Sequence, residues 1–226
     1  MKFIAFILTF VMFTLSAHAQ TYEIGAFLGG ANYIGDIGRS TYIAPKTTAI
    51  GGILKWNRST RHAFRVSMIF SSIEANDSDA TDERRQERGY SFENRLIEAS
   101  IGLEYNFWDF NIYDGHVAST PYLYTGVTVA QHDEHFKSGN EIIAYDSINT
   151  FAIPMVVGYK IIFSNNVLLG MEIGARYTFT DNLDGSDPGG PLDSSKFGDI
   201  SNNDWYVFTG ITLTIGMVRK PCYCNF

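Results

Sequence analysis

Two histidines and two carboxylates stand together in the stretch QHDEHF, as His132, Asp133, Glu134 and His135. Imidazole nitrogens and carboxylate oxygens are common ligands of transition metals. However, the stretch lies where a predicted strand enters a predicted loop, so no helix brings the two histidines onto one face. Their spacing matches no zinc pattern well. A metal site therefore competes with an ordinary polar loop, which needs no special geometry.

A second acidic stretch, DNLDGSDPGG, spans residues 181–190 and places Asp181, Asp184 and Asp187 close together. Carboxylates at short spacing are typical of a calcium loop, but the full pattern and the closing bidentate glutamate are absent. A flexible acidic loop is the simpler interpretation, and calcium binding by the loop 181–204 stays open at this point.

Catalysis on a lipid substrate would need a serine, a base and an acid held together. His132 or His135 could supply the base and Ser147 the nucleophile, but their spacing supports no such set. We therefore expect a protein that is not an enzyme and that has no catalytic residues, metal or cofactor.

The N-terminus indicates export. Lys2 precedes an apolar run over residues 3–15, and Ala17-His18-Ala19 forms an A-x-A cleavage pattern. The run is too short to cross a bilayer as a helix, so residues 1–19 are expected to be a signal peptide. The 17 Lys and Arg residues against 24 Asp and Glu give a net charge of −7. An acidic chain argues against nucleic acid as a partner.

Alternation of apolar and polar residues is the main structural signal after residue 20. In VFTGITLTIGM, for example, Val207, Ile211 and Ile215 fall on one face and Gly210 and Thr214 on the other. Eight such segments are predicted as strands: 21–30, 47–56, 61–73, 92–107, 120–131, 150–163, 167–180 and 205–218. No segment predicts a helix. Pro154 is a misfit inside the sixth segment, because proline cannot donate to a ladder.

Long and short connections alternate along this pattern. The segments 31–46, 74–90, 132–149 and 181–204 are long, whereas 57–60 and 164–166 are short turns. This is expected of an outer-membrane barrel with long extracellular loops and short periplasmic turns. We therefore predict an all-β fold: an eight-stranded antiparallel up-and-down transmembrane barrel over residues 20–218, with both termini in the periplasm.

A soluble lipocalin-like cup also has eight antiparallel strands, but its lumen is apolar and its outer surface polar. The membrane interpretation is favoured here because the polar face is rich in glycine, as a narrow lumen requires. The same face carries few charges of both signs, which must pair if they are buried. The predicted lumen charges are Glu23, Arg65, Glu98, Glu104, Lys160, Glu172 and Arg176. They could line a conduction path, but at eight strands a packed plug is expected.

The three tryptophans all fall at predicted strand ends, which is typical of the aromatic girdles of membrane barrels. Trp56 and Trp108 are predicted at the periplasmic end and Trp205 at the outer end. Other aromatic residues join them: Phe107, Phe110, Tyr113 and Phe163 at the periplasmic end, and Tyr177, Phe179 and Tyr206 at the outer end. Outer-membrane lipids are thus the first expected partner.

The last eight residues, RKPCYCNF, hold both cysteines of the chain. Pro221 should end the last strand, so residues 219–226 are expected to form a tail in the oxidising periplasm. Cys222 and Cys224 could form a strained local disulfide, stay as thiols, or link to a periplasmic partner. A docking role would also use the other charged and aromatic tail residues, Arg219, Lys220, Tyr223 and Phe226.

The stretch YEIGAFLGGANYIGDIG (residues 22–38), which begins in the first predicted strand, resembles the opening of the PorG-like outer-membrane proteins of the Bacteroidota type IX secretion system. The most specific part is Asn32-Tyr33-Ile34-Gly35-Asp36. The resemblance implies a structural role without enzyme activity. The barrel would anchor the periplasmic ring of a secretion and gliding machine, a lipoprotein and its partner of PorK/PorN or GldK/GldN type. The alternative is an OmpA-like small barrel whose acidic loops mediate adhesion or surface binding.

Overall fold

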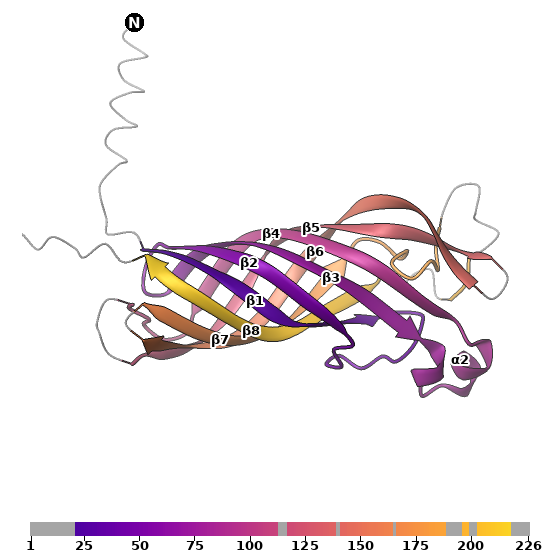
Figure 1. Cartoon of the computed structure of the whole chain (residues 1–226), viewed down its shortest axis with the longest axis horizontal. Helices are drawn as coiled ribbons and strands as arrows, with labels where there is room; N and C mark the ends of the chain where they lie inside the picture. Colours follow the sequence, from indigo (N-terminus) through magenta and orange to yellow (C-terminus); the bar gives the residue numbers. More distant parts are fainter. Residues whose placement is uncertain are drawn as a thin grey trace, which may run out of the picture.

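Eight antiparallel strands close into a single barrel in the order β1 to β8, as the computed structural model shows (Figure 1). The structure describes residues 21–112, 117–138, 141–164, 166–188, 196–198 and 203–217. The strands are β1 (Thr21–Ile34), β2 (Thr47–Asn57), β3 (His62–Asn76), β4 (Ser91–Asn106), β5 (Ser119–Ser138), β6 (Glu141–Ser164), β7 (Val167–Thr178) and β8 (Trp205–Met217). Each of the eight predicted segments forms a strand, and the predicted fold class is confirmed.

The two ends of the barrel differ. Tyr22 near the start of β1 pairs with Met217 at the end of β8, so the first and last strands begin and finish at one end. The described connecting residues 58–61, 107–112, 117–118 and 166 lie at this end too, and we call it the turn end. The opposite end, called the loop end, carries the longer described connections 35–46, 77–90, 179–188, 196–198 and 203–204 (Figure 1).

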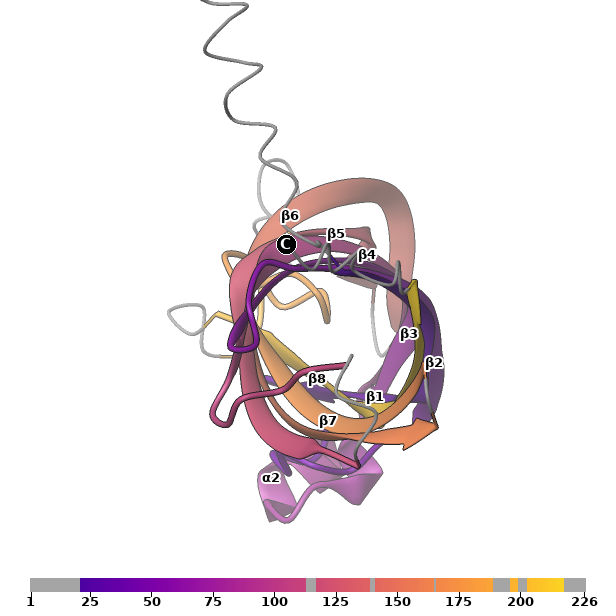
Figure 2. The same ribbon diagram turned by 90° about the vertical axis from the view of Figure 1, so that its left-hand side faces the viewer.

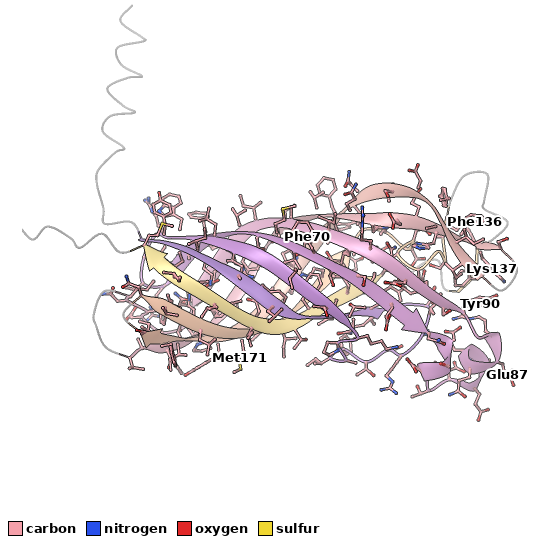
Figure 3. All side chains as sticks on the ribbon, in the orientation of Figure 1. Phe70, Glu87, Tyr90, Phe136, Lys137 and Met171 are labelled. Atoms are coloured by element: carbon pink, nitrogen blue, oxygen red, sulfur yellow. The ribbon has the colours of Figure 1, made fainter. Side chains whose placement is uncertain are left out.

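The outer wall of the barrel is apolar. Large side chains such as Phe70 and Met171 point away from the sheet, and 46% and 64% of their surfaces are exposed (Figure 3). Period-two alternation places the neighbouring polar residues inside, where charged side chains such as Arg65 and Glu98 are fully buried. An apolar exterior around a charged interior is the reverse of the soluble lipocalin-like arrangement and fits a wall that faces lipid.

Close approach between strands depends on paired glycines on the inner face. Gly102 of β4 lies opposite Gly126 of β5. A Cβ at position 102 would come within 2.1 Å of the Thr125 backbone oxygen, and a Cβ at position 126 within 2.1 Å of the Ile101 oxygen. A side chain therefore cannot be added to either glycine without moving the backbone.

Two predictions about the connections were wrong. Residues 132–149 do not form a loop, because β5 continues to Ser138 and β6 begins at Glu141, with a register shift between Glu134 and His135. The segment 77–90 contains a 3₁₀ turn, η1 (Asp77–Asp79), and a short helix, α2 (Glu83–Arg88). Asp82 caps the first turn of α2, and Gly89 ends it in the left-handed conformation at φ 68°. Neither of these described helices is long and apolar enough to cross a membrane.

Pro154 stays inside β6, with neither a bulge nor a later strand start. It pairs with Arg176 of β7 on one side. On the other side the β5 ladder lacks partners between Thr125↔Met155 and Thr128↔Ala152, without a change of register. The missing proline N–H thus costs a short interruption in one ladder rather than a break in the strand.

The barrel interior has an apolar cluster at each end. At the loop end the cluster includes Phe27, Tyr33, Phe92, Leu183 and Phe208. At the turn end, the segment after β4 runs across the opening of the barrel (Figure 2). Its Phe110 and Ile112 form a cluster with Ile162 and Leu168. Phe110 was predicted in the aromatic girdle, and its buried position, 5% exposed, corrects that prediction.

Substituting Gly102 by alanine tests the close strand contact. We expect Gly102→Ala to destabilise the barrel by about 1–3 kcal/mol, because the new Cβ meets backbone rather than a movable side chain. The matched control is Gly52→Ala, where an added Cβ meets nothing within 4 Å. Urea unfolding of the barrel in detergent micelles measures both, and equal stability of the two variants would contradict the steric account.

Candidate functional site

Glu104 of β4 is the centre of the buried charge network in the lumen. The Nζ atoms of Lys160 and Lys55 lie 2.6 and 2.8 Å from its two carboxylate oxygens. These lysines come from β6 and β2, on either side of β4, so one carboxylate ties three parts of the wall together. Both ammonium groups also lie over aromatic rings, Lys160 at 4.8 Å from Phe110 and Lys55 at 5.3 Å from Tyr122.

Arg65 and Glu172 form a bidentate pair next to Glu104. The two terminal nitrogens of Arg65 on β3 donate to the Glu172 carboxylate on β7 at 2.7 and 2.9 Å. Tyr122 adds a third donor, with its hydroxyl 2.7 Å from Glu172 Oε2. Because β3 and β7 are not neighbours in the sheet, this pair crosses the lumen and occupies the space that a conduction path would need.

A second, separate pair lies nearer the loop end. Arg176 Nε donates to Glu98 Oε2 at 3.1 Å, and the Tyr206 hydroxyl donates to the same oxygen at 2.7 Å. Tyr206 was predicted in the outer girdle, but it is fully buried and faces the lumen, which corrects that prediction. Arg176 also lies 4.5 Å from the centre of the Phe208 ring, so the ionic pair packs directly on the apolar cluster of the loop end.

The remaining lumen carboxylate, Glu23, is held by neutral donors. Asn57 Nδ2 lies 2.6 Å from Glu23 Oε1, and Thr214 Oγ1 lies 3.0 Å from Oε2. The lumen thus holds four carboxylates and four cations, all at most 4% exposed: Glu23, Glu98, Glu104, Glu172, Lys55, Arg65, Lys160 and Arg176. Seven of these eight were in the predicted set. Lys55 was missed, although its alternation with Ile53 placed it on the same face.

Side chains and backbone of the loop end form a cover over the lumen. Asn94 Nδ2 donates to the backbone oxygens of Asp133 and Leu183, both at 2.8 Å, and Asn94 Oδ1 accepts from Asp133 N at 2.8 Å. One amide therefore replaces the missing β4–β5 ladder pair and binds the segment 181–188. Leu183 is fully buried beneath it, so this segment enters the mouth of the barrel rather than extending into solvent.

Asp77 fastens the first two long connections to each other. Its carboxylate accepts from Gly38 N at 2.9 Å and from Tyr90 N at 3.0 Å, and Arg88 Nε donates to it at 2.8 Å. Although burial opposes ionisation, these hydrogen bonds, from Arg88 foremost, lower the pKa of Asp77 below its usual value. The connection that contains α2 is therefore attached to the connection after β1 by a buried ion pair.

Asp184 and Asp204 form a buried carboxyl pair in the same cover. Tyr33 donates its hydroxyl to Asp204 Oδ1, Leu183 N donates to Asp204 Oδ2 at 2.9 Å, and Ser186 N donates to Asp184 Oδ1 at 2.9 Å. Burial raises the pKa of both carboxyls. The charge of Asp184 raises the pKa of Asp204 further, and Asp36 and Asp181 contribute in the same direction. Such a pair holds a proton more readily than isolated aspartates do.

The histidines of QHDEHF lie in β5 and point inward. His132 and His135 are 1% and 3% exposed, and Asn94 and the backbone of Asp133 lie within hydrogen-bond distance of His135 Nδ1. The polar-loop interpretation is therefore wrong for both. In the part of the chain that the structure describes, no group of three or more His, Cys, Asp or Glu side chains could hold a metal ion.

The tryptophans lie at the two ends of the wall. At the turn end, Trp56 stacks on Phe64 at 5.3 Å, and Trp108 is 54% exposed and packs edge-on against Tyr159. At the loop end, Trp205 packs against Tyr177 at 5.0 Å. Tyr113, the predicted signal peptide 1–19 and the predicted tail 219–226, including Cys222 and Cys224, lie outside the described residues.

The turn end presents a cross-linked surface, which we call the turn platform: residues 56–62 and 106–110. Phe110 N donates to Thr60 O and Asn106 N to Arg61 O, at 3.1 and 2.8 Å. Arg61 Nε donates to Asp109 Oδ1 at 2.8 Å, and this bond lowers the pKa of Asp109. Arg58 lies 5.9 Å from the centre of the Trp56 ring. The platform is therefore a fixed arrangement of arginine and tryptophan side chains.

The Glu98–Arg176 pair allows a clean test of the lumen network. We expect Arg176→Met to cost about 3–5 kcal/mol of stability, because it leaves the buried Glu98 carboxylate without its cation. The double variant Glu98→Gln/Arg176→Met should recover much of that loss. Urea unfolding in micelles measures the cycle, with Lys46→Met at the half-exposed Lys46–Asp79 pair as the control that should change little. Additive single losses would show that the pair is not coupled.

The Asp184–Asp204 pair predicts that the cover loosens as pH rises. The folded pKa values lie above the ordinary aspartate value of about 3.9, so the native state binds more protons than the unfolded state. Stability of the segment 181–188 should therefore fall as pH rises from about 4 through the raised pKa values. Amide exchange of this segment, corrected for intrinsic rates, should show the trend in the wild type and in the control Glu87→Gln. The trend should be weaker in Asp204→Asn, which keeps the buried Asp184, and absent in Asp184→Asn/Asp204→Asn. A trend that persists in the double variant would contradict the assignment.

Comparison with known proteins gives a family and several resemblances of fold. No curated protein sequence matches the chain. Among solved structures, the N-terminal β-barrel domain of Pseudomonas aeruginosa OprF is 13% identical, with a TM-score of 0.44, over 86% of this chain and 97% of that one. Neisserial surface protein A is 11% identical, with a TM-score of 0.46, over 88% and 97%. A major outer membrane protein from Thermus thermophilus is 13% identical, with a TM-score of 0.46, over 88% and 100%. The family described as "Domain of unknown function (DUF6089)" matches residues 1–226, and the chain belongs to this family.

Proposed function

We propose that this protein is a structural outer-membrane barrel that anchors the periplasmic ring of a type IX secretion machine. In this proposal the turn end faces the periplasm and the loop end faces the cell exterior. The partners are outer-membrane lipids around the wall, and a ring lipoprotein with its companion (PorK/PorN or GldK/GldN type) below the turn platform. The resemblance of residues 22–38 to PorG-like proteins motivates the choice of machine.

A sealed lumen supports a passive role. The Arg65–Glu172 pair crosses the lumen, Phe110 and Ile112 fill its turn end, and the segment 181–188 covers its loop end. With charges paired inside and apolar clusters at both ends, the lumen is filled along its length. The surfaces that such a barrel offers to protein partners are therefore its two ends.

The turn platform is the observation that carries the proposal. Its backbone is fixed by hydrogen bonds between residues 60–61 and 106–110, so a partner would meet a pre-formed surface. Arg58, Arg61 and Trp108 expose the residue types that are enriched at interface centres. The acidic connections lie at the other end, which leaves the platform relatively basic and suited to an acidic surface on a ring subunit.

The tail would extend this surface. β8 ends at Met217 on the turn end, so a tail that follows it would begin at the same end as the platform. In an oxidising compartment, Cys222 or Cys224 would join a partner cysteine by an intermolecular disulfide, while Arg219, Lys220, Tyr223 and Phe226 would add charge and aromatic contact. This covalent link is a separable part of the proposal, because the platform alone could dock without it.

Gels and co-purification test the anchor directly. In outer membranes run without reductant, we expect a heavier band that collapses on reduction, disappears in Cys222→Ser or Cys224→Ser, and contains the ring lipoprotein by mass spectrometry. Arg58→Glu, and truncation after Val218, should each reduce several-fold the amount of ring lipoprotein that co-purifies with the barrel. Arg84→Glu on α2 is the matched control at the other end, with a side chain that is 90% exposed.

The outcomes separate the parts of this proposal. A monomer in every lane would overturn the disulfide and leave docking through the platform. Full recovery of the ring with both Arg58→Glu and the truncated chain would overturn the anchor itself.

The second candidate is an OmpA-like barrel that acts through its loop end in adhesion or surface binding. A groove of about 600 Å³ at that end favours it, lined by Glu74, Asn76, Asp79 and Glu93 among others. Glu74 and Glu93 are direct cross-strand partners, so two like charges stand side by side in the groove. Surface attachment that is lost on neutralising these two carboxylates, but unaffected by truncation after Val218, would favour this candidate over the anchor.

A further inference from the structure

The β5–β6 hairpin extends past the strands on both of its sides. β4 pairs with β5 only as far as Leu96↔His132. β7 pairs with β6 only from Thr178↔Ala152 toward the turn end. Beyond these points, among the described residues, residues 133–138 of β5 have a ladder partner only in β6, and residues 141–151 of β6 have one only in β5. We call residues 133–138 and 141–151 the ribbon (Figure 1).

The β6 strand of the ribbon has an open edge. Phe179 N donates to Phe151 O at 3.0 Å, and after this bond the chain of β7 turns away into the barrel mouth. Among the described residues, no backbone-to-backbone hydrogen bond joins residues 142–150 to any strand but β5. Ser147 N donates to the Asp146 side chain at 2.8 Å, and the Tyr145 hydroxyl donates to Pro188 O at 3.3 Å. Residues 143–149 are all exposed. Nine residues at about 3.4 Å each give an edge of roughly 30 Å. Alternate residues turn their N–H and C=O groups outward, except at the register shift beside Tyr145.

The ribbon is a formed structure rather than a loose loop. Phe136 and Tyr145 pack edge-on across its two strands, with ring centres 5.6 Å apart. Ser147 Oγ donates to Asp133 Oδ1 at 2.6 Å, a second link between the strands. Lys137 Nζ lies 4.8 Å from the centre of the Tyr90 ring, which ties the ribbon to the segment that comes after α2 (Figure 3). A partner strand would therefore meet an ordered edge.

The edge lacks the residue types that usually block strand addition. Such edges are commonly protected by lysine, proline or a covering segment. Residues 142–150 contain neither lysine nor proline, and Ile143, Tyr145 and Ile148 are 40–44% exposed. The charges along the ribbon are mainly acidic, from Asp133, Glu134 and Asp146, whereas its Lys137 lies over Tyr90. A partner strand should therefore carry positive charge together with apolar side chains.

We propose that the open edge of β6, residues 142–150, binds an extended, positively charged segment of a partner protein as an added β-strand. Main-chain hydrogen bonds would supply the affinity, and the acidic and apolar side chains of the ribbon would select the segment. A second copy of this chain is a poorer occupant, because edge-to-edge pairing of two ribbons would bring their acidic groups together. The site is at the loop end and does not depend on the anchor role of the turn platform.

A defined peptide pair tests this proposal on the whole barrel in detergent micelles. The probe is a labelled peptide of alternating Lys and Ile, and its control replaces each Lys by Glu. We expect the anisotropy of the Lys peptide to rise on binding and the amides of residues 142–150 to gain protection from exchange. The Glu peptide should bind at least tenfold more weakly at low salt.

Two kinds of variant locate the binding. Ile148→Pro and Asn149→Pro occupy adjacent positions in the regular ladder, away from the register shift beside Tyr145. One of them therefore removes an N–H that faces the open edge, and that variant should lose at least tenfold in affinity. Asp146→Asn should weaken binding about two- to fivefold, whereas Glu87→Gln, on exposed α2, should leave it unchanged. A gel shift of unheated against heated protein verifies that each variant is folded.

Several results would overturn the proposal. These are unchanged protection of residues 142–150 with the Lys peptide, equal binding of the Glu peptide, or full binding by both folded proline variants. Self-association of the barrel that is lost in the proline variants would assign the edge to a second copy instead.

Discussion

The rest of the structure depends on the pairing of charges in a lumen too narrow for water to solvate them. An eight-stranded barrel has an interior just wide enough for its own side chains. Arg65 and Glu104 are fully buried there, and an unpaired ion in such a place would cost several kcal/mol. Each cation must therefore meet a carboxylate from another strand, which fixes how the strands are arranged around the axis. The bidentate Arg65–Glu172 contact does this most directly, because it joins two strands that are not neighbours.

The same narrowness accounts for the distribution of the other side chains. Long charged side chains have small cross-strand neighbours: Gly102 is the ladder partner of Arg65, and Gly210 is the ladder partner of Glu172. Toward both ends the charges give way to aromatic rings that pack against the last cation, Phe110 under Lys160 and Phe208 over Arg176. Cation–π contacts let an ionic layer meet an apolar layer without leaving a polar gap. The charged layer of the lumen and the apolar clusters at its two ends are thus in direct contact.

The sequence predicted the wall well and the ends poorly, for a physical reason. Between the ends, lipid on one side and a packed lumen on the other enforce period-two alternation, so all eight strands and seven of the eight lumen charges could be recognised. Past the membrane both faces of a strand can be wet, and residues 143–149 show no alternation to detect. Phe110 and Tyr206 were predicted in the girdles because they are aromatic and lie at strand ends. Whether such a side chain points toward lipid or into the lumen depends on tertiary packing, which the sequence pattern does not show. Helix α2 had usable signals in Asp82 and Gly89, which cap it, yet its six residues are too few for a helical period.

The two ends also solve the problem of exposed backbone in different ways, which bears on what each can do. At the turn end, backbone groups just past the strands find hydrogen-bond partners in neighbouring turns. Asn106 N donates to Arg61 O, and Phe110 N donates to Thr60 O. That end is closed, and a partner there must bind side chains. At the loop end, Asn94 closes one side of the β5–β6 hairpin by standing in for a strand, but nothing described does so along residues 142–150 of the other side. A barrel normally has no strand edges, but among the described residues β6 outlasts β7 and leaves such an edge. An open edge of this kind is recognised through main chain, so the two proposed interactions differ in kind: a folded surface would meet the platform, and an extended segment would meet the ribbon.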